Sequence, residues 1–144
     1  MSQEISQRNV TRNQSTADYA VKRLFIFDNR FTEGIYKNNT LVDMTLKTGM
    51  LVARGAVAGG LIPITADNLA DAIGIAAQEG DVVLAANATS NINFCTKGTI
   101  MTNHLVLPAG VTLDTMVGNK SLRDLLESIG FHLEFAVENT KFDN

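Results

Sequence analysis

The chain has 144 residues, of which 45% are apolar and 19% charged, and its formal net charge of -3 at pH 7 argues against a nucleic-acid binder, which normally carries a basic stripe. A chain of this size can bury roughly 68% of its unfolded surface, so one domain with a true core is expected. The single Cys95 excludes an intrachain disulfide and a multi-cysteine zinc site, and no run approaches the roughly 18 apolar residues of a membrane span.

Residues 1–22 are rich in Ser, Gln, Asn, Thr and Arg, and their few apolar side chains cannot offset the entropy of ordering. We predict a flexible arm, disordered when free, ahead of a single β-rich domain over residues 23–144. The start lacks the features of a secretory signal, which predicts synthesis and retention in a cytoplasm. An arm of this kind orders on another protein's surface or is an inert tail. Its candidate binding residues are Ile5, Val10, Arg12 and Tyr19.

The first part of the domain reads as short strands. Arg23–Phe27 is a nearly continuous apolar run, which predicts a buried strand that ends in a turn at Asp28-Asn29. Gly34 allows a second break. Residues Thr40–Leu46 alternate in polarity and are expected to form a strand with one buried face.

Glycines punctuate the stretch Lys47–Ile100 at near-regular intervals, which is typical of a compact all-β unit. Its first two apolar runs, residues 50–54 and 61–64, flank a glycine-rich link that fits a broad hairpin loop or a small-residue contact surface. Pro63 is expected to place its run at a sheet edge or leading out of the sheet, and to end regular pairing there. Thr65–Ala70 fits one helical turn capped by Thr65. In the run that follows, Gly74 replaces a side chain and indicates close packing.

The second half of the stretch predicts another hairpin, formed by Val82–Leu84 and Ile92–Phe94. Cys95 follows Phe94, and a lone thiol among apolar neighbours is expected to be a small core residue. After a further break at Gly98, two apolar pieces lead to a loop at residues 108–110, and residues 111–117 fit either a strand or a helix.

The clearest helix begins after Ser121, because Asp124 completes an S-x-x-D capping pattern. Leucines and an isoleucine at helical spacing predict its buried stripe, and Gly130 is expected to end it. A strand with one polar face then follows over Phe131–Val137.

The residues that carry chemistry do not assemble into a recognisable site. Gly118–Ser121 lacks the spacing of a phosphate loop, and Ser121 and Asp124 are better explained as a helix cap than as parts of a triad with His132. His104 and His132 lie in no metal-binding frame, and His132 is expected to form a surface pair with Glu134. We therefore predict no catalytic residue, no cofactor, no metal site and no enzyme activity.

Across residues 40–100, the order and spacing of these features resemble those of the head decoration, or cement, proteins of tailed bacteriophages. In that family a polar arm precedes a small β-rich body. The matching strand, glycines, apolar runs and G-I-A segment are Leu41–Leu46, Gly49, Met50–Ala53, Leu61–Ile64, Gly74–Ala76, Gly80–Val82 and Gly98. Residues 111–137 follow no motif of the family.

The resemblance implies a structural virion protein: a homotrimer on the outer capsid surface, whose arm clamps the major capsid protein and stabilises the shell without catalysis. The expected fold is mainly β with a minor α part, a small β-barrel or β-tulip-like body with one short C-terminal helix. Neither nucleic acid nor a membrane is an expected partner. The residues leave two alternatives open: a small intracellular ligand-binding or enzymatic β domain, and another virion component such as a head fibre base or tail protein.

Overall fold

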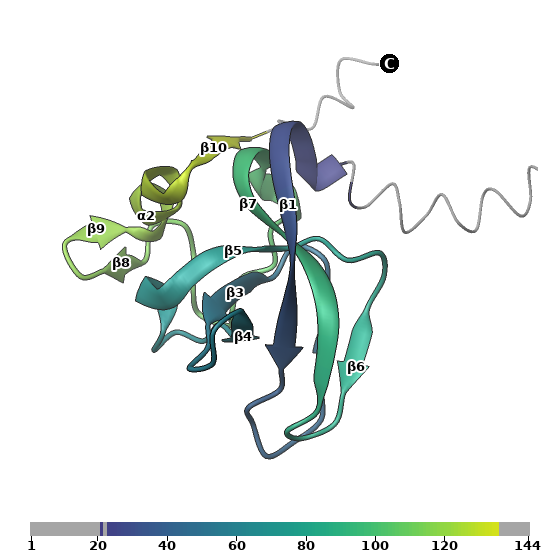
Figure 1. Ribbon diagram of the computed structural model, residues 1–144. Helices are drawn as coiled ribbons and strands as arrows, with labels where there is room; N and C mark the ends of the chain where they lie inside the picture. Colours follow the sequence, from purple (N-terminus) through teal and green to yellow (C-terminus); the bar gives the residue numbers. More distant parts are fainter. Residues whose placement is uncertain (1–20, 22, 136–144) are drawn as a thin grey trace, which may run out of the picture.

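The body of the protein is a closed barrel of five strands, seen in a computed structural model that describes residues 21 and 23–135. The strands follow one another around the barrel in the order β1-β4-β3-β5-β7, and β7 pairs back with β1. The predicted mainly β fold, a small barrel with one short C-terminal helix, is confirmed (Figure 1). The strands are β1 (Phe25–Lys37), β3 (Leu51–Arg54), β4 (Gly60–Pro63), β5 (Ala72–Ala76) and β7 (Thr89–Met101).

Two long strands support the barrel. β1 and β7 each have 13 residues and pair antiparallel over nearly their whole length, from Phe25 opposite Ile100 to Lys37 opposite Thr89. On its other edge β1 pairs in parallel with β4. The other edge of β7 is shared by β5 and by β10 (Phe131–Glu134), which lies parallel to it.

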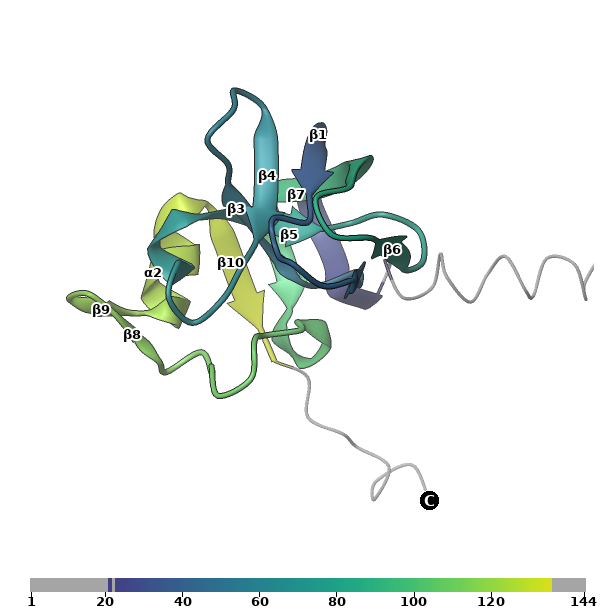
Figure 2. The ribbon, with the colours of Figure 1, turned by 90° about the horizontal axis from the view of Figure 1, so that it is seen from below.

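Smaller elements flank the barrel on opposite sides (Figures 1 and 2). On one side, a ribbon is formed by β2 and β6. On the other, helix α2 lies beside β10 and the hairpin of β8 and β9. The bounds of these elements and of the two 3₁₀ turns are β2 (Met44–Leu46), β6 (Val82–Leu84), η1 (Leu69–Asp71), η2 (Thr102–His104), β8 (Met116–Val117), β9 (Lys120–Ser121) and α2 (Leu122–Ile129).

The buried side chains form two clusters. The first joins the barrel to α2 and β10 and includes Leu122, Leu126 and Phe131. The second joins the barrel to the ribbon and includes Leu46, Leu84 and the fully buried Tyr36, the pKa of which is raised by burial. Val21, which falls within the predicted arm, packs against the first cluster. The rest of the predicted arm lies outside the described residues.

The C-terminal helix forms as its capping pattern predicts. The Ser121 hydroxyl accepts a hydrogen bond from the Asp124 N–H at 3.2 Å, and Gly130 ends α2 with a positive φ of 122°. Leu122 and Leu126 are fully buried, while the other apolar residues of the stripe are partly buried. The strand that follows, β10, is shorter than the predicted Phe131–Val137: it ends at Glu134.

The predicted turn at Asp28-Asn29 is wrong, because β1 continues through it. Asp28 takes a left-handed conformation, with φ of 51°, and the register to β7 shifts on both sides of it. The polar residues thus form a bulge, and the unbroken partner strand β7 carries the pairing across it. Gly34 and Gly98, which the sequence marks as breaks, both lie inside these long strands.

The second predicted hairpin is also wrong. β6 pairs with β2, and Ile92–Phe94 pairs with β1, so residues 85–88 connect two different parts of the fold. Of the strand predicted at Thr40–Leu46, only Met44–Leu46 is extended in a ladder. Residues 39–42 instead fold around Asn38. Its side chain, and not a neighbouring strand, forms hydrogen bonds with the Thr40 N–H and the Val42 carbonyl oxygen.

The glycine-rich region follows the prediction more closely. β3 and β4 form a hairpin, one of the two alternatives for the glycine-rich link, and regular pairing ends at Pro63 as predicted. The edge placement is wrong, because β4 pairs with β1 as well as with β3. A Cβ atom on Gly74 would lie 2.6 Å from the Cys95 carbonyl oxygen, which confirms close packing there. The helical turn falls later than predicted, at η1, because the Thr65 N–H bonds to the side-chain oxygen of Asn68 at 2.6 Å and forms a separate turn. Residues 111–117 are irregular apart from the two residues of β8.

Candidate interaction surfaces

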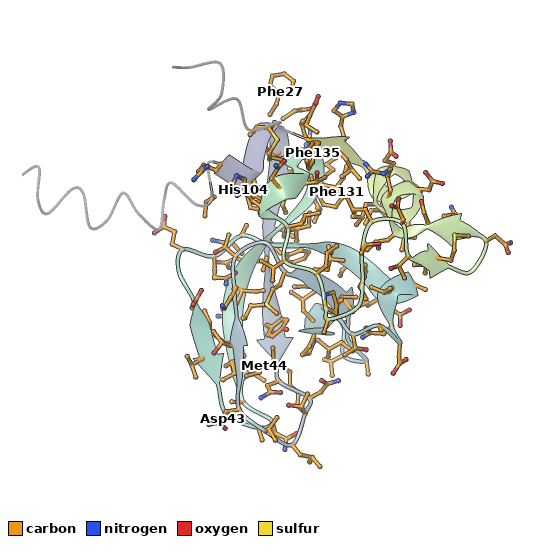
Figure 3. All side chains as sticks on the ribbon, turned by 180° about the vertical axis from the view of Figure 1, so that it is seen from behind. Phe27, Asp43, Met44, His104, Phe131 and Phe135 are labelled. Carbon is orange, nitrogen blue, oxygen red and sulfur yellow. The ribbon has the colours of Figure 1, made fainter. Side chains whose placement is uncertain are left out.

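Large apolar side chains are exposed at two opposite ends of the body. The ribbon end consists of Leu41, Val42 and Val83, which are 90%, 67% and 71% exposed. The phenylalanine end consists of Phe27 and Phe135, which are 72% and 70% exposed. Figure 3 shows Phe27 and Phe135 at one end, and Asp43 and Met44 of the ribbon region at the other. Val57, between β3 and β4, and Met116 of β8 are also exposed, so these two ends hold only part of the exposed apolar surface of the described residues. Groups of exposed apolar side chains are typical of interaction sites.

The ribbon end is held in place by the fully buried Asn38. Its side-chain N–H2 group lies within hydrogen-bond distance of three carbonyl oxygens, those of Val42 at 2.7 Å and of Leu84 and Ala85 at 3.1 Å. Its side-chain oxygen accepts bonds from the backbone N–H and hydroxyl of Thr40. A satisfied buried amide of this kind fixes the loop, so the apolar side chains beside it are presented from a rigid support.

The phenylalanine end is built on the edge where β1, β7 and β10 start or finish. Phe27, Thr99 and His132 lie in one row across these strands. His132 and Glu134 form the predicted surface pair, with Nε2 and Oε1 3.0 Å apart, and the Thr102 hydroxyl donates to the Glu134 carbonyl oxygen at 3.0 Å. The described chain also begins and ends at this end, at Val21 and Phe135 (Figure 1).

A third feature is an open groove of about 890 Å³ on the side of the barrel. It is lined by β1 at Phe31–Glu33, by β7 at Asn91–Asn93, by Ala77–Glu79 after β5, and by Val21. Gln78 is only 7% exposed, and its side-chain N–H2 donates to the Leu46 carbonyl oxygen at 3.0 Å. Its side-chain oxygen is buried and has no hydrogen-bond donor among the described residues.

The structure does not test the sequence-predicted binding residues. Ile5, Val10, Arg12 and Tyr19 lie outside the described residues, so their role stays a prediction. His104 and His132 lie on different elements, and neither lines the groove. Nothing in the sequence around Asn38 signals that it is buried.

Cys95 lies in the core, as its apolar neighbours predict, and we expect it to react slowly with thiol reagents. Burial raises the pKa of its thiol and outweighs the opposing hydrogen bonds with Asn29 and Lys97. The thiolate is the reactive form, so burial and the raised pKa both slow alkylation. At pH 8 the folded protein should react at least about a hundredfold more slowly than protein unfolded in guanidinium. Similar rates in the two states would contradict a closed core around β7.

No known family model matches the sequence, and no curated protein matches it. Among the described residues, no three His, Cys, Asp or Glu side chains are placed to hold a metal ion. In the same part of the chain, no helix is both long enough and apolar enough to cross a membrane.

Proposed function

We propose that this protein is a capsid decoration protein, a non-enzymatic virion component that binds the outer surface of a phage shell and stabilises it. The observation that carries the proposal is the pair of apolar ends on a rigid barrel. Phe27 and Val83 project from strands and Val42 from the turn fixed by Asn38, so partners would meet preformed surfaces at little entropic cost.

The phenylalanine end is the better candidate for contact with the major capsid protein. The first described residue, Val21, packs against the barrel cluster that also includes Phe25, two residues from Phe27. The arm and the phenylalanine end would then contact one continuous region of the shell. This arrangement leaves the ribbon end for contacts between copies of the chain in a homotrimer.

Several arms held by one trimer would bind the shell cooperatively. Linking weak sites raises the effective concentration of each after the first has bound, so the combined affinity exceeds that of one arm by roughly a hundredfold or more. Each arm therefore needs to contribute only a few kcal/mol. The apolar and basic side chains of Ile5, Val10, Arg12 and Tyr19 are the proposed contacts.

Deletion of residues 1–20 tests this function. We expect the truncated protein to fold and to assemble like the full chain, but to lose binding to empty expanded capsids by at least a hundredfold, because avidity disappears with the arm. Co-sedimentation measures binding, and light scattering measures assembly. Lys120→Ala, a change at an exposed position of β9, serves as a control that should bind normally. Binding of the truncated protein as tight as that of the full chain would refute the role of the arm.

The groove beside Gln78 is the observation that favours a second candidate, a small ligand-binding β domain. Its concave surface, and a buried oxygen that has no donor in the described part of the chain, are features of a binding site. However, Cys95, His104 and His132 do not line it. The presence of the protein in purified phage particles, at a copy number close to that of the shell's lattice sites, would favour capsid decoration over ligand binding.

A further inference from the structure

The groove is open along the edge of β7. The Asn93 carbonyl oxygen accepts a hydrogen bond from the Ala77 N–H at 2.9 Å, so the polar backbone groups of Asn93 point away from β1. Backbone groups of alternate residues in a strand point the same way, so those of Asn91 also point to this side. β5 has ended at Ala76, and no described strand continues along β7 there. Among the described residues, the Asn91 carbonyl oxygen receives one bond, a long one of 3.4 Å from the Ser90 hydroxyl.

An unpaired strand edge of this kind is a template for an added strand. The groove supplies two further features that an extended peptide would use. The half-exposed ring of Phe31 offers an apolar surface, and the buried side-chain oxygen of Gln78 lacks a donor among the described residues. Extended peptides bind such sites with main-chain hydrogen bonds for affinity and with alternate side chains for specificity.

The charges of the groove indicate a basic peptide. Glu33 and Glu79 are both exposed on its walls, and neither carboxylate forms an ion pair with a described residue. An apolar residue between two basic ones, at every second position of a strand, would place its three side chains on one face. The sequence contains this pattern once in the segment before the body, at Arg8, Val10 and Arg12.

We propose that residues 8–12 of the same chain dock in this groove as an extra strand along β7, with Val10 against Phe31 and the two arginines beside Glu33 and Glu79. Val21 lines the groove, so the segment starts at its rim. The eight residues between Arg12 and Val21 make nine Cα–Cα steps, which can span up to roughly 30 Å and allow a return along the barrel. Docking within one chain is favoured over docking between chains, because the tether gives an effective concentration on the order of millimolar.

The docked state goes beyond the proposed function and, where that function holds, regulates it. An arm that binds its own body is withheld from other surfaces until a partner offers stronger contacts. A docked strand competes with the shell, so release of the arm becomes part of the binding step. The docking itself involves the isolated protein only, and its test needs no capsid.

Hydrogen exchange of the Asn91 amide in the full-length protein tests the proposal, because the added strand would accept a bond from that N–H. The double variant Arg8→Glu with Arg12→Glu should increase this exchange rate about tenfold, since it replaces two attractive charge pairs with repulsive ones. Adding Glu33→Lys and Glu79→Lys to that variant should restore slow exchange. A protein with Lys120→Glu and Arg123→Glu, which carries the same change in net charge far from the groove, should exchange as the wild type does.

Three outcomes would overturn the proposal. The first is an Asn91 amide that exchanges equally fast in the wild type and in the double variant. The second is a failure of the charge swap at residues 33 and 79 to restore protection. The third is protection that falls on dilution, which would assign the docked segment to a second copy of the chain. If the protein docks its arm in the groove but does not bind capsids, the proposed function fails and this inference stands. If it binds capsids but does not dock the arm, this inference fails and the proposed function stands.

Discussion

Gly98→Ala is expected to lower the free energy of unfolding by about 3 kcal/mol, a large share of the stability of a small domain. Gly98 lies inside β7 with φ of +124°, a conformation that side chains rarely adopt. A Cβ atom there would lie 2.6 Å from the Asn29 Cα and 2.7 Å from the Asp28 carbonyl oxygen. Both neighbours are backbone atoms of the β1 bulge, so neither can move without disturbing the β1–β7 ladder.

Urea unfolding of Gly98→Ala beside Gly110→Ala separates the contact from the backbone conformation. Gly110 also has a positive φ, +77°, but no atom lies within 4 Å of the position of its Cβ. Its replacement should therefore cost only the conformational part, about 1 kcal/mol. Equal losses in the two variants would mean that the bulge is not closely packed on Gly98, and the account of β1 given above would be wrong.

The sequence predicts the fold best where local patterns decide the structure. The cap at Ser121 and the β3–β4 hairpin that ends at Pro63 depend on neighbours close in the chain, and both form. The errors arise where a distant strand decides. A turn signal at Asp28-Asn29 becomes a bulge because β7 supplies a continuous partner, and alternation near Leu41 does not become a strand because Asn38 binds the local backbone.

The candidate surfaces were harder to predict than the fold. Apolar residues are usually assigned to the core, so the sequence gives no sign that Leu41, Val42 and Phe27 are exposed while the polar Asn38 is buried. The groove depends on where β5 leaves β7, which follows from the closure of the barrel and not from any local motif. The alternation of basic and apolar residues at 8–12 is visible in the sequence. Proposing that this segment binds the groove also requires knowing where the carboxylates of Glu33 and Glu79 lie.

Asn38→Asp should destabilise the protein by about 4 kcal/mol at pH 7, although the two side chains have nearly the same shape. The change replaces the N–H2 donor with a second oxygen, which would face the carbonyl oxygens of Val42, Leu84 and Ala85 at 2.7 to 3.1 Å. A buried charge would then have no donor on that side. The two bonds from Thr40 to the retained oxygen offset only part of this cost.

The loss caused by Asn38→Asp should also depend on pH. Burial and the three carbonyl dipoles would raise the pKa of the introduced carboxyl above its unfolded value of about 3.9. The folded state then binds the proton more tightly than the unfolded state, so the deficit is greatest above the folded pKa and shrinks as the pH falls towards about 4. Urea unfolding at pH 7 and pH 4.5, each against the wild type at the same pH, measures this difference. As a control, Asn119→Asp, an exposed change in the β8–β9 turn, should cost under about 0.5 kcal/mol at both pH values. If the stability deficit of Asn38→Asp does not shrink at the lower pH, a buried charge is ruled out as its cause.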